Sequence, residues 1–262
     1  MSDSAPKPLM GCGIVITRPA HQAQSLAAKV RVAGGRVILF PAIEITGPED
    51  LQSFYAVVDQ LQDFDVAVFV SPNAVTRAFE LIAARRALPG RLVVAAIGDA
   101  TVSALERCGV REVIAPAHSF DSEALLALPF FQQAKGKRIA IFRGQGGREL
   151  LGDTLLARGA HVQYAECYRR VVPKISSAPL YEGWARNELH AFVVTSSIGL
   201  KNLLAMVGEP GAARLRTTPL IVPHPRIAEN ARQLAFSKVL VTGAGDDGIV
   251  SGLCDHFAHG PT

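Results

Sequence analysis

The chain has 262 residues, of which 49% are hydrophobic and 19% charged, a balance typical of a globular protein rather than a disordered one. No apolar run approaches the roughly 20 residues that span a bilayer, and residues 1–8 lack a signal-peptide core, so we expect a loose N-terminal tail, a cytoplasmic protein and no membrane partner. The net charge of +4 favours an acidic ligand, but scattered cations and only 6% aromatic residues argue against nucleic acid.

The cysteines and histidines show no metal-site spacing. Cys12, Cys108, Cys167 and Cys254 are far apart and form no C-x-x-C pair, and the seven histidines form no H-E-x-x-H motif. The sequence therefore predicts free thiols, no bound metal and no disulfide framework.

Short β-branched runs alternate with amphipathic stretches along the whole chain. The expected strands are residues 14–17, 37–40, 66–70, 92–97, 139–142, 162–165, 192–195, 220–222 and 239–242. The expected helices are residues 20–33, 73–86, 100–108, 147–158, 198–206 and 226–235. This alternation predicts parallel sheets covered by helices, with ligands bound beyond the carboxyl ends of the strands.

The chain resembles itself at a constant shift of 125 residues. Residues 13–40 align with 138–165, so that Arg18 meets Arg143, and residues 66–71 align with 191–196. One shift held over separate blocks indicates an internal duplication. The equivalent extended segments 42–46 and 167–172 then predict two crossings between two lobes, with long strands inside a single sheet as the alternative.

The glycine-rich loop 144–149 is a candidate anion site. It nearly matches the dinucleotide fingerprint, with Glu166 near the place of a ribose-binding acid, but Glu149 replaces the third glycine. Free N–H groups at a helix start, flanked by Arg143 and Arg148, suit any anion. A nucleotide, a different anion and a plain tight turn all stay open.

Polar residues also follow two equivalent buried strands. Ser71 and Asn73 follow the first, and Thr195, Ser196 and Ser197 follow its counterpart. All are good helix caps. The functional alternative is that these hydroxyls and the neighbouring N–H groups bind carboxylates from two sides of a cleft.

A third pair of strand ends carries Gly98 and Thr101 in one copy and His224 and Arg226 in the other. A capped glycine turn and a rigid proline-flanked surface turn are the structural alternatives to ligand binding. Tyr168 lies in the second crossing. A phenol, whose ordinary pKa is about 10, is a neutral donor that could protonate a leaving hydroxyl, although a strand tyrosine commonly serves packing.

Together these motifs resemble the uroporphyrinogen-III synthase family from about Gly13 to Phe257. The resemblance rests on the order and spacing of Thr17-Arg18-Pro19, residues 69–75, residues 96–98 with Thr101, residues 143–149, Tyr168-Arg169-Arg170, Thr195-Ser196 and residues 222–226. It implies an α/β fold of two similar parallel-sheet lobes joined by a two-stranded β hinge, with the duplicated segments exchanged. Lobe 1 would comprise residues 1–38 and 173–262, lobe 2 residues 46–165, and the hinge residues 39–45 and 166–172.

The resemblance also implies a reaction and a substrate. Hydroxymethylbilane, a linear tetrapyrrole with acetate and propionate arms, would lose water and close with inversion of ring D, through a spiro intermediate, to uroporphyrinogen III. Such a lyase of haem biosynthesis needs no metal or redox cofactor. Tyr168 matches the family tyrosine proposed to assist the departure of hydroxide.

The remaining candidates are expected to bind substrate carboxylates: Arg18, Ser71, Asn73, Gly98, Thr101, Arg143, Gly144, Arg148, Thr195, Ser196, Ser197, His224 and Arg226. Arg18 and Arg143 could instead pair with acids in the fold. Residues 223–226 depart from the G-x-T-T-like turn of eukaryotic members, and our hypothesis is that Arg226, with His224, takes over a carboxylate contact there.

Two rival functions stay open at the level of sequence. One is a two-lobed binding protein for an acidic small molecule, without catalysis. The other is a nucleotide-dependent enzyme that uses residues 144–149 and Glu166. We expect a monomer, and the sequence leaves open whether the protein contacts the preceding enzyme of the pathway.

Overall fold

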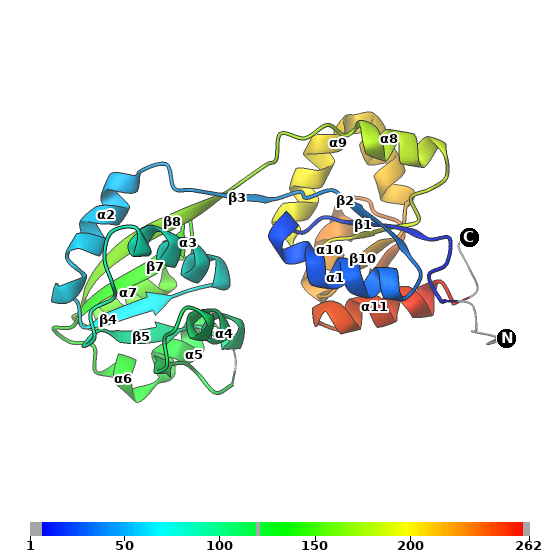
Figure 1. Ribbon diagram of the computed structural model, residues 1–262. Helices are drawn as coiled ribbons and strands as arrows, with labels where there is room; N and C mark the ends of the chain where they lie inside the picture. Colours follow the sequence, from blue (N-terminus) through cyan, green and yellow to red (C-terminus); the bar gives the residue numbers. More distant parts are fainter. Residues whose placement is uncertain (1–6, 119–120, 259–262) are drawn as a thin grey trace. The chain divides into compact units, whose positions relative to one another are not determined.

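Parallel strands form two separate sheets in the computed structural model, which describes residues 7–118 and 121–258 (Figure 1). The chain divides into two compact units: residues up to Glu44 together with those from Val171 onward form unit 1, and Ile45–Arg170 form unit 2. The chain therefore passes from one unit to the other twice. Residues 1–6 of the expected N-terminal tail lie outside the described residues.

Unit 1 contains a five-stranded sheet in the order β11-β10-β9-β1-β2, with every neighbouring pair parallel. Its strands are β1 (Gly13–Ile16), β2 (Arg36–Leu39), β9 (Ala191–Val193), β10 (Leu220–Val222) and β11 (Val239–Val241). Its helices are α1 (Ala20–Val32), α8 (Ala178–Ala185), α9 (Ser197–Thr217), α10 (Pro225–Gln233) and α11 (Gly245–His256).

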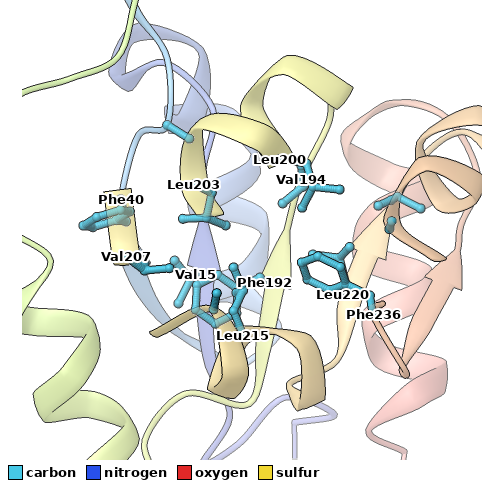
Figure 2. Packing of buried hydrophobic residues seen from close by; sticks show 14 of the residues in the cluster. Val15, Phe40, Phe192, Val194, Leu200, Leu203, Val207, Leu215, Leu220 and Phe236 are labelled. Atoms are coloured by element: carbon cyan, nitrogen blue, oxygen red, sulfur yellow. The ribbon is translucent and has the colours of Figure 1, made fainter. Parts of the chain in front are cut away.

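Both faces of this sheet are buried. Because side chains alternate along a strand, Ile14 and Ile16 pack under α1 and α11, whereas Val15 points to the other face. There it packs with Phe192 under α8, α9 and α10 (Figure 2). Burial on two faces explains why the strands are continuous apolar runs in the sequence.

Unit 2 contains a six-stranded sheet in the order β3-β8-β7-β4-β5-β6. Its strands are β3 (Glu44–Thr46), β4 (Val66–Phe69), β5 (Val93–Ala96), β6 (Val113–Ile114), β7 (Arg138–Gly144) and β8 (His161–Val171). Its helices are α2 (Leu51–Asp59), α3 (Pro72–Ala83), α4 (Asp99–Arg107), α5 (Ser122–Ala127), α6 (Pro129–Gln132) and α7 (Leu150–Ala157), with a short 3₁₀ helix at Leu61–Asp63.

The two sheets share one strand order when residues are related by the 125-residue shift. β1 and β2 of unit 1 correspond to β7 and β8 of unit 2, and β9 and β10 correspond to β4 and β5. The pairings Ile14–Val37 and Ile139–Val162 also agree in register. The predicted parallel sheets are thus confirmed, while the duplication and the exchange of its segments stay predictions.

Some predicted element boundaries are wrong. Residues 162–165 and 167–172 belong mostly to one continuous strand, β8, which ends at Val171. Residues 42–46 do not extend β2, which ends at Leu39. A further hydrogen bond runs from the N–H of Ala42 to the carbonyl oxygen of Thr17, and the chain then joins the other sheet at β3. Helix α9 continues beyond residue 206 to Thr217, with a left-handed Gly208 at its kink.

Candidate active site

An extra residue in β8 shapes the edge of the sheet in unit 2. Arg143 pairs with Glu166, but the next residue, Gly144, pairs with Tyr168, so Cys167 forms a β-bulge. A single extra residue moves the following side chains to the opposite face of the sheet. Tyr168 therefore leaves the face that carries Tyr164 and Glu166.

The Cys167 thiol is part of this bulge rather than a free nucleophile. It is buried and donates to the carbonyl oxygens of Arg143 at 3.3 Å and Ala74 at 3.5 Å. Burial raises the pKa of the Cys167 thiol to about 12, so the thiol stays protonated at neutral pH and unreactive as a nucleophile.

Gly144 makes room for the ring of Tyr168. A Cβ at this position would lie 2.5 Å from the Tyr168 Cζ atom, closer than any side chain tolerates. The ring is 1% exposed, and its phenol oxygen lies 3.2 Å from the Ser71 Oγ atom. Ser71 in turn caps α3 by accepting a hydrogen bond from the N–H of Ala74 at 3.1 Å.

These residues line a pocket of about 230 Å³ at the carboxyl ends of β4 and β7. Its walls include the following residues: Ser71, Ser122, Arg143, Gly144, Arg148, Leu151, Tyr164, Tyr168 and Arg170. No carboxylate lines it among the described residues, so the pocket suits an acidic ligand. A second pocket, of about 420 Å³, shares Ser71 with the first and includes Gly98 and Thr101.

Arg143 is engaged within the protein. Its Nε and Nη2 atoms donate to Glu166 Oε1 at 3.2 and 3.0 Å, and its guanidinium lies 3.7 Å from the ring centroid of Tyr164. Its Nη1 atom lies 3.4 Å from the carbonyl oxygen of Gly147, which ties it to the glycine loop. Glu166, considered above as a ribose-binding acid, is therefore the partner of Arg143.

Arg18, the counterpart of Arg143 in unit 1, is engaged in the same way and lies 2.5 Å from Asp246. Of the two alternatives for these arginines, pairing with acids in the fold is the one that the structure shows. In contrast, the exposed Arg148 makes no hydrogen bond or ion pair with the residues that the structure describes.

Tyr164 and Arg170 are among the pocket residues that were not predicted from sequence. Tyr164 supports Arg143, and Arg170 donates to the phenol oxygen of Tyr168 at 2.9 Å. Arg170 stands two residues after Tyr168 on one strand, and this spacing was the signal that could have found it. Asn73 is half-buried in the first turn of α3 and is not among the pocket residues.

The candidates of unit 1 follow β9 and β10. Ser196 caps α9 by accepting from the N–H of Gly199 at 3.0 Å, and Ser197 accepts from Asn230 at 2.6 Å. His224 caps α10 by accepting from the N–H of Arg226 at 3.1 Å. Thr195 is half-buried after β9, and the exposed Arg226 side chain has no hydrogen bond or ion pair within residues 7–118 and 121–258.

Metal-binding clusters and membrane-spanning helices are both absent from the part of the chain that the structure describes. No group of three or more His, Cys, Asp or Glu side chains there could hold a metal ion. No helix there is long and apolar enough to cross a membrane.

The fold and the pocket define an α/β protein of two units. In unit 2, a pocket at the ends of the strands is lined by a buried tyrosine and by arginines. The sequence model described as uroporphyrinogen-III synthase HemD matches residues 24–248. The uroporphyrinogen-III synthase of Escherichia coli is 33% identical over 236 residues, which cover 89% of this chain and 96% of that protein. The Salmonella typhimurium enzyme is 34% identical over 239 residues, again covering 89% and 96%.

The chain belongs to the uroporphyrinogen-III synthase family, whose members are cyclising lyases of haem biosynthesis. Solved structures agree at the level of the fold. A Thermus thermophilus uroporphyrinogen III synthase superposes with a TM-score of 0.63 at 17% identity, covering 95% of this chain and 99% of the other. For the Helicobacter pylori uroporphyrinogen-III synthetase the TM-score is 0.59 at 16% identity, with 95% and 98% covered. The resemblance inferred from the motifs is thus confirmed.

Replacing Gly144 by Ala should displace the phenol of Tyr168, since the new Cβ overlaps the ring. We expect kcat for uroporphyrinogen III formation to fall by up to about a hundredfold, the scale of a 1 Å misplacement. Gly90→Ala is the matched control, because a Cβ there would meet no atom within 4 Å. Steady-state kinetics measure both, and an unchanged kcat in Gly144→Ala would contradict the assigned packing.

Proposed function

We propose that this chain dehydrates and cyclises hydroxymethylbilane, with inversion of ring D, to give uroporphyrinogen III. The main observation that supports this function is the position of the Tyr168 phenol on the wall of a pocket. The described residues that line this pocket include arginines and no carboxylate. The substrate bears acetate and propionate arms, so its charge complements that lining. Family membership supplies the reaction, and the pocket supplies a place for its leaving group.

Positioning is the main catalytic effect in this proposal. The bilane closes spontaneously to the wrong isomer, so the protein must hold the chain in the curl that brings the inverted ring to the reacting carbon. Holding reacting atoms in the right geometry lowers a barrier without any cofactor. The reaction releases water and changes no oxidation state overall, and it needs no metal or redox cofactor.

Tyr168 would assist the loss of the hydroxyl group from the terminal hydroxymethyl carbon. Its phenol is neutral when protonated, and it is held at the pocket by Gly144 and Ser71. A neutral donor can protonate the leaving oxygen without bringing net charge among the substrate carboxylates.

The strand ends of each unit would bind carboxylates. In unit 2 the proposed contacts are Ser71, Asn73, Gly98, Thr101, Gly144 and Arg148; in unit 1 they are Thr195, Ser196, Ser197, His224 and Arg226. The caps leave each serine hydroxyl its own proton to donate. Arg18 and Arg143 each form an ion pair with an acid of the fold, so we assign them to positioning the loops.

The setting of the reaction is also a proposal. We place it in the cytoplasm and expect the chain to act as a monomer. A transient contact with the preceding enzyme would shorten the time during which the free bilane closes to the wrong isomer.

Incubation with freshly generated hydroxymethylbilane tests the function. We expect mainly the type III isomer of uroporphyrinogen, resolved from type I by chromatography after oxidation. Type I alone would contradict the proposal, and slowed closure without type III would favour a binding protein. NAD(P) and ATP should leave the melting temperature unchanged, because a tight ligand would raise it.

Tyr168→Phe should lower kcat by less than about a thousandfold, because positioning persists when proton donation is lost. KM should change little, since the ring keeps its packing against Gly144. Initial rates with the folded variant measure this. If a folded variant showed no turnover at all, positioning would account for less of the rate than we propose.

Arg226→Ala should raise KM for the bilane about fivefold, as expected when an exposed charge pair worth ~1 kcal/mol is lost. Arg232→Ala is the matched control, because Arg232 is exposed on the last turn of the same helix, α10. Equal KM values for the two variants would rule out the Arg226 contact.

A further inference from the structure

Arg170 is bound to the phenol oxygen of Tyr168. The two residues are two apart on β8, the Arg170 Nη2 atom lies 2.9 Å from the Tyr168 oxygen, and the guanidinium lies 5.2 Å from the centroid of its ring. A guanidinium has donors and no acceptor. The direction of this hydrogen bond is therefore fixed, and the phenol oxygen accepts.

The direction of that bond decides where the phenol proton can go. Because the oxygen accepts from Arg170, its own proton must be donated elsewhere, to Ser71 Oγ at 3.2 Å or to a ligand in the pocket. Ser71 Oγ already accepts from the N–H of Ala74 and has a second lone pair free for the phenol. The bond from Arg170 thus leaves the phenol proton pointing away from Arg170, toward Ser71 or toward a ligand in the pocket.

We propose that Arg170 is a positioning residue that orients the phenol of Tyr168 and stabilises charge on its oxygen during the loss of water, a role that rests on the proposed function. When the C–O bond of the hydroxymethyl group breaks, its electron pair leaves with the oxygen. The oxygen takes the phenol proton and departs as water. The charge left on the phenolate lies beside the guanidinium, and the proton released when the closing pyrrole regains aromaticity restores the phenol.

The electrostatics of the pocket favour this role. Hydrogen bonds with a charged donor are about twice as strong as neutral ones. Arg170 is itself exposed, so its bond to the phenol lies at the rim of the pocket, between solvent and the buried ring. Arg170 forms no ion pair within the described residues, so its charge is not neutralised by a carboxylate. Tyr168 itself is fully buried.

The neighbouring Arg169 is a built-in comparison. It carries the same charge on the same strand, but it pairs with Glu49 at 2.5 Å and does not line the pocket. Replacing either arginine by Gln removes one positive charge from the strand. Only the Arg170 change removes the bond to the phenol.

Arg170→Gln should lower kcat for type III formation about tenfold to a hundredfold, somewhat less than the loss of a donor that touches the reacting oxygen directly. KM should stay within about twofold, because the proposed role acts on the leaving step and not on carboxylate binding. Arg169→Gln should keep both constants within about twofold. Urea unfolding midpoints of both variants check that they fold. A rise in KM with unchanged kcat for Arg170→Gln would show a carboxylate contact and overturn the proposal.

A double-mutant cycle tests whether Arg170 acts through Tyr168. If it does, Tyr168→Phe/Arg170→Gln should have the kcat of Tyr168→Phe alone within about twofold. Fully multiplicative losses would overturn the proposal.

Type III formation by the unsubstituted chain is measured first, and its absence would contradict the proposed function itself. If type III forms and the Arg170→Gln variant has unaltered kinetics, only the role of Arg170 is overturned.

Discussion

The candidate site depends on one extra residue in a strand. Without the bulge at Cys167, the alternation of β8 would place Tyr168 on the same face as Tyr164 and Glu166. The bulge turns the phenol toward Ser71 at the start of α3, and Gly144 on the neighbouring strand leaves it room. The buried thiol of Cys167 fits this role because its two carbonyl partners need a hydrogen-bond donor. Its strongly raised pKa keeps the thiol protonated, so that it can donate.

The three arginines that line the pocket differ in whether they have an acidic partner. Arg143 is neutralised by Glu166, stacks on Tyr164 and contacts the carbonyl oxygen of Gly147, so it shapes the glycine loop. Arg148 and Arg170 line the pocket and form no ion pair among the described residues. The glycine-rich loop 144–149 thus presents to the pocket one cation that is unpaired among the described residues, Arg148. Its flanking arginines have different tasks, because only one of them has an acid within reach.

The fold could be predicted from sequence further than the site could. The alternation of apolar runs with amphipathic stretches predicted the parallel sheets. The constant shift of 125 residues holds even for strand register, since it relates the pair Ile14–Val37 to the pair Ile139–Val162. Cap types at Ser71 and Ser196 were also readable, because capping is local. The bulge at Cys167 could not be predicted from sequence, since strand register depends on the partner strand. The pairing of Arg143 with Glu166 joins side chains 23 positions apart, and no local pattern marks it.

The discontinuous make-up of unit 1 has a consequence for biosynthesis. Ile45–Arg170 is an unbroken segment with its own sheet and core, and can become compact as soon as it has left the ribosome. Strands β1 and β2 are made earlier, yet the neighbour of β1 on its other side is β9, near residue 191. The first-made strands must therefore wait with an exposed edge until the last third of the chain is translated, so the newborn protein is most vulnerable to aggregation at its beginning.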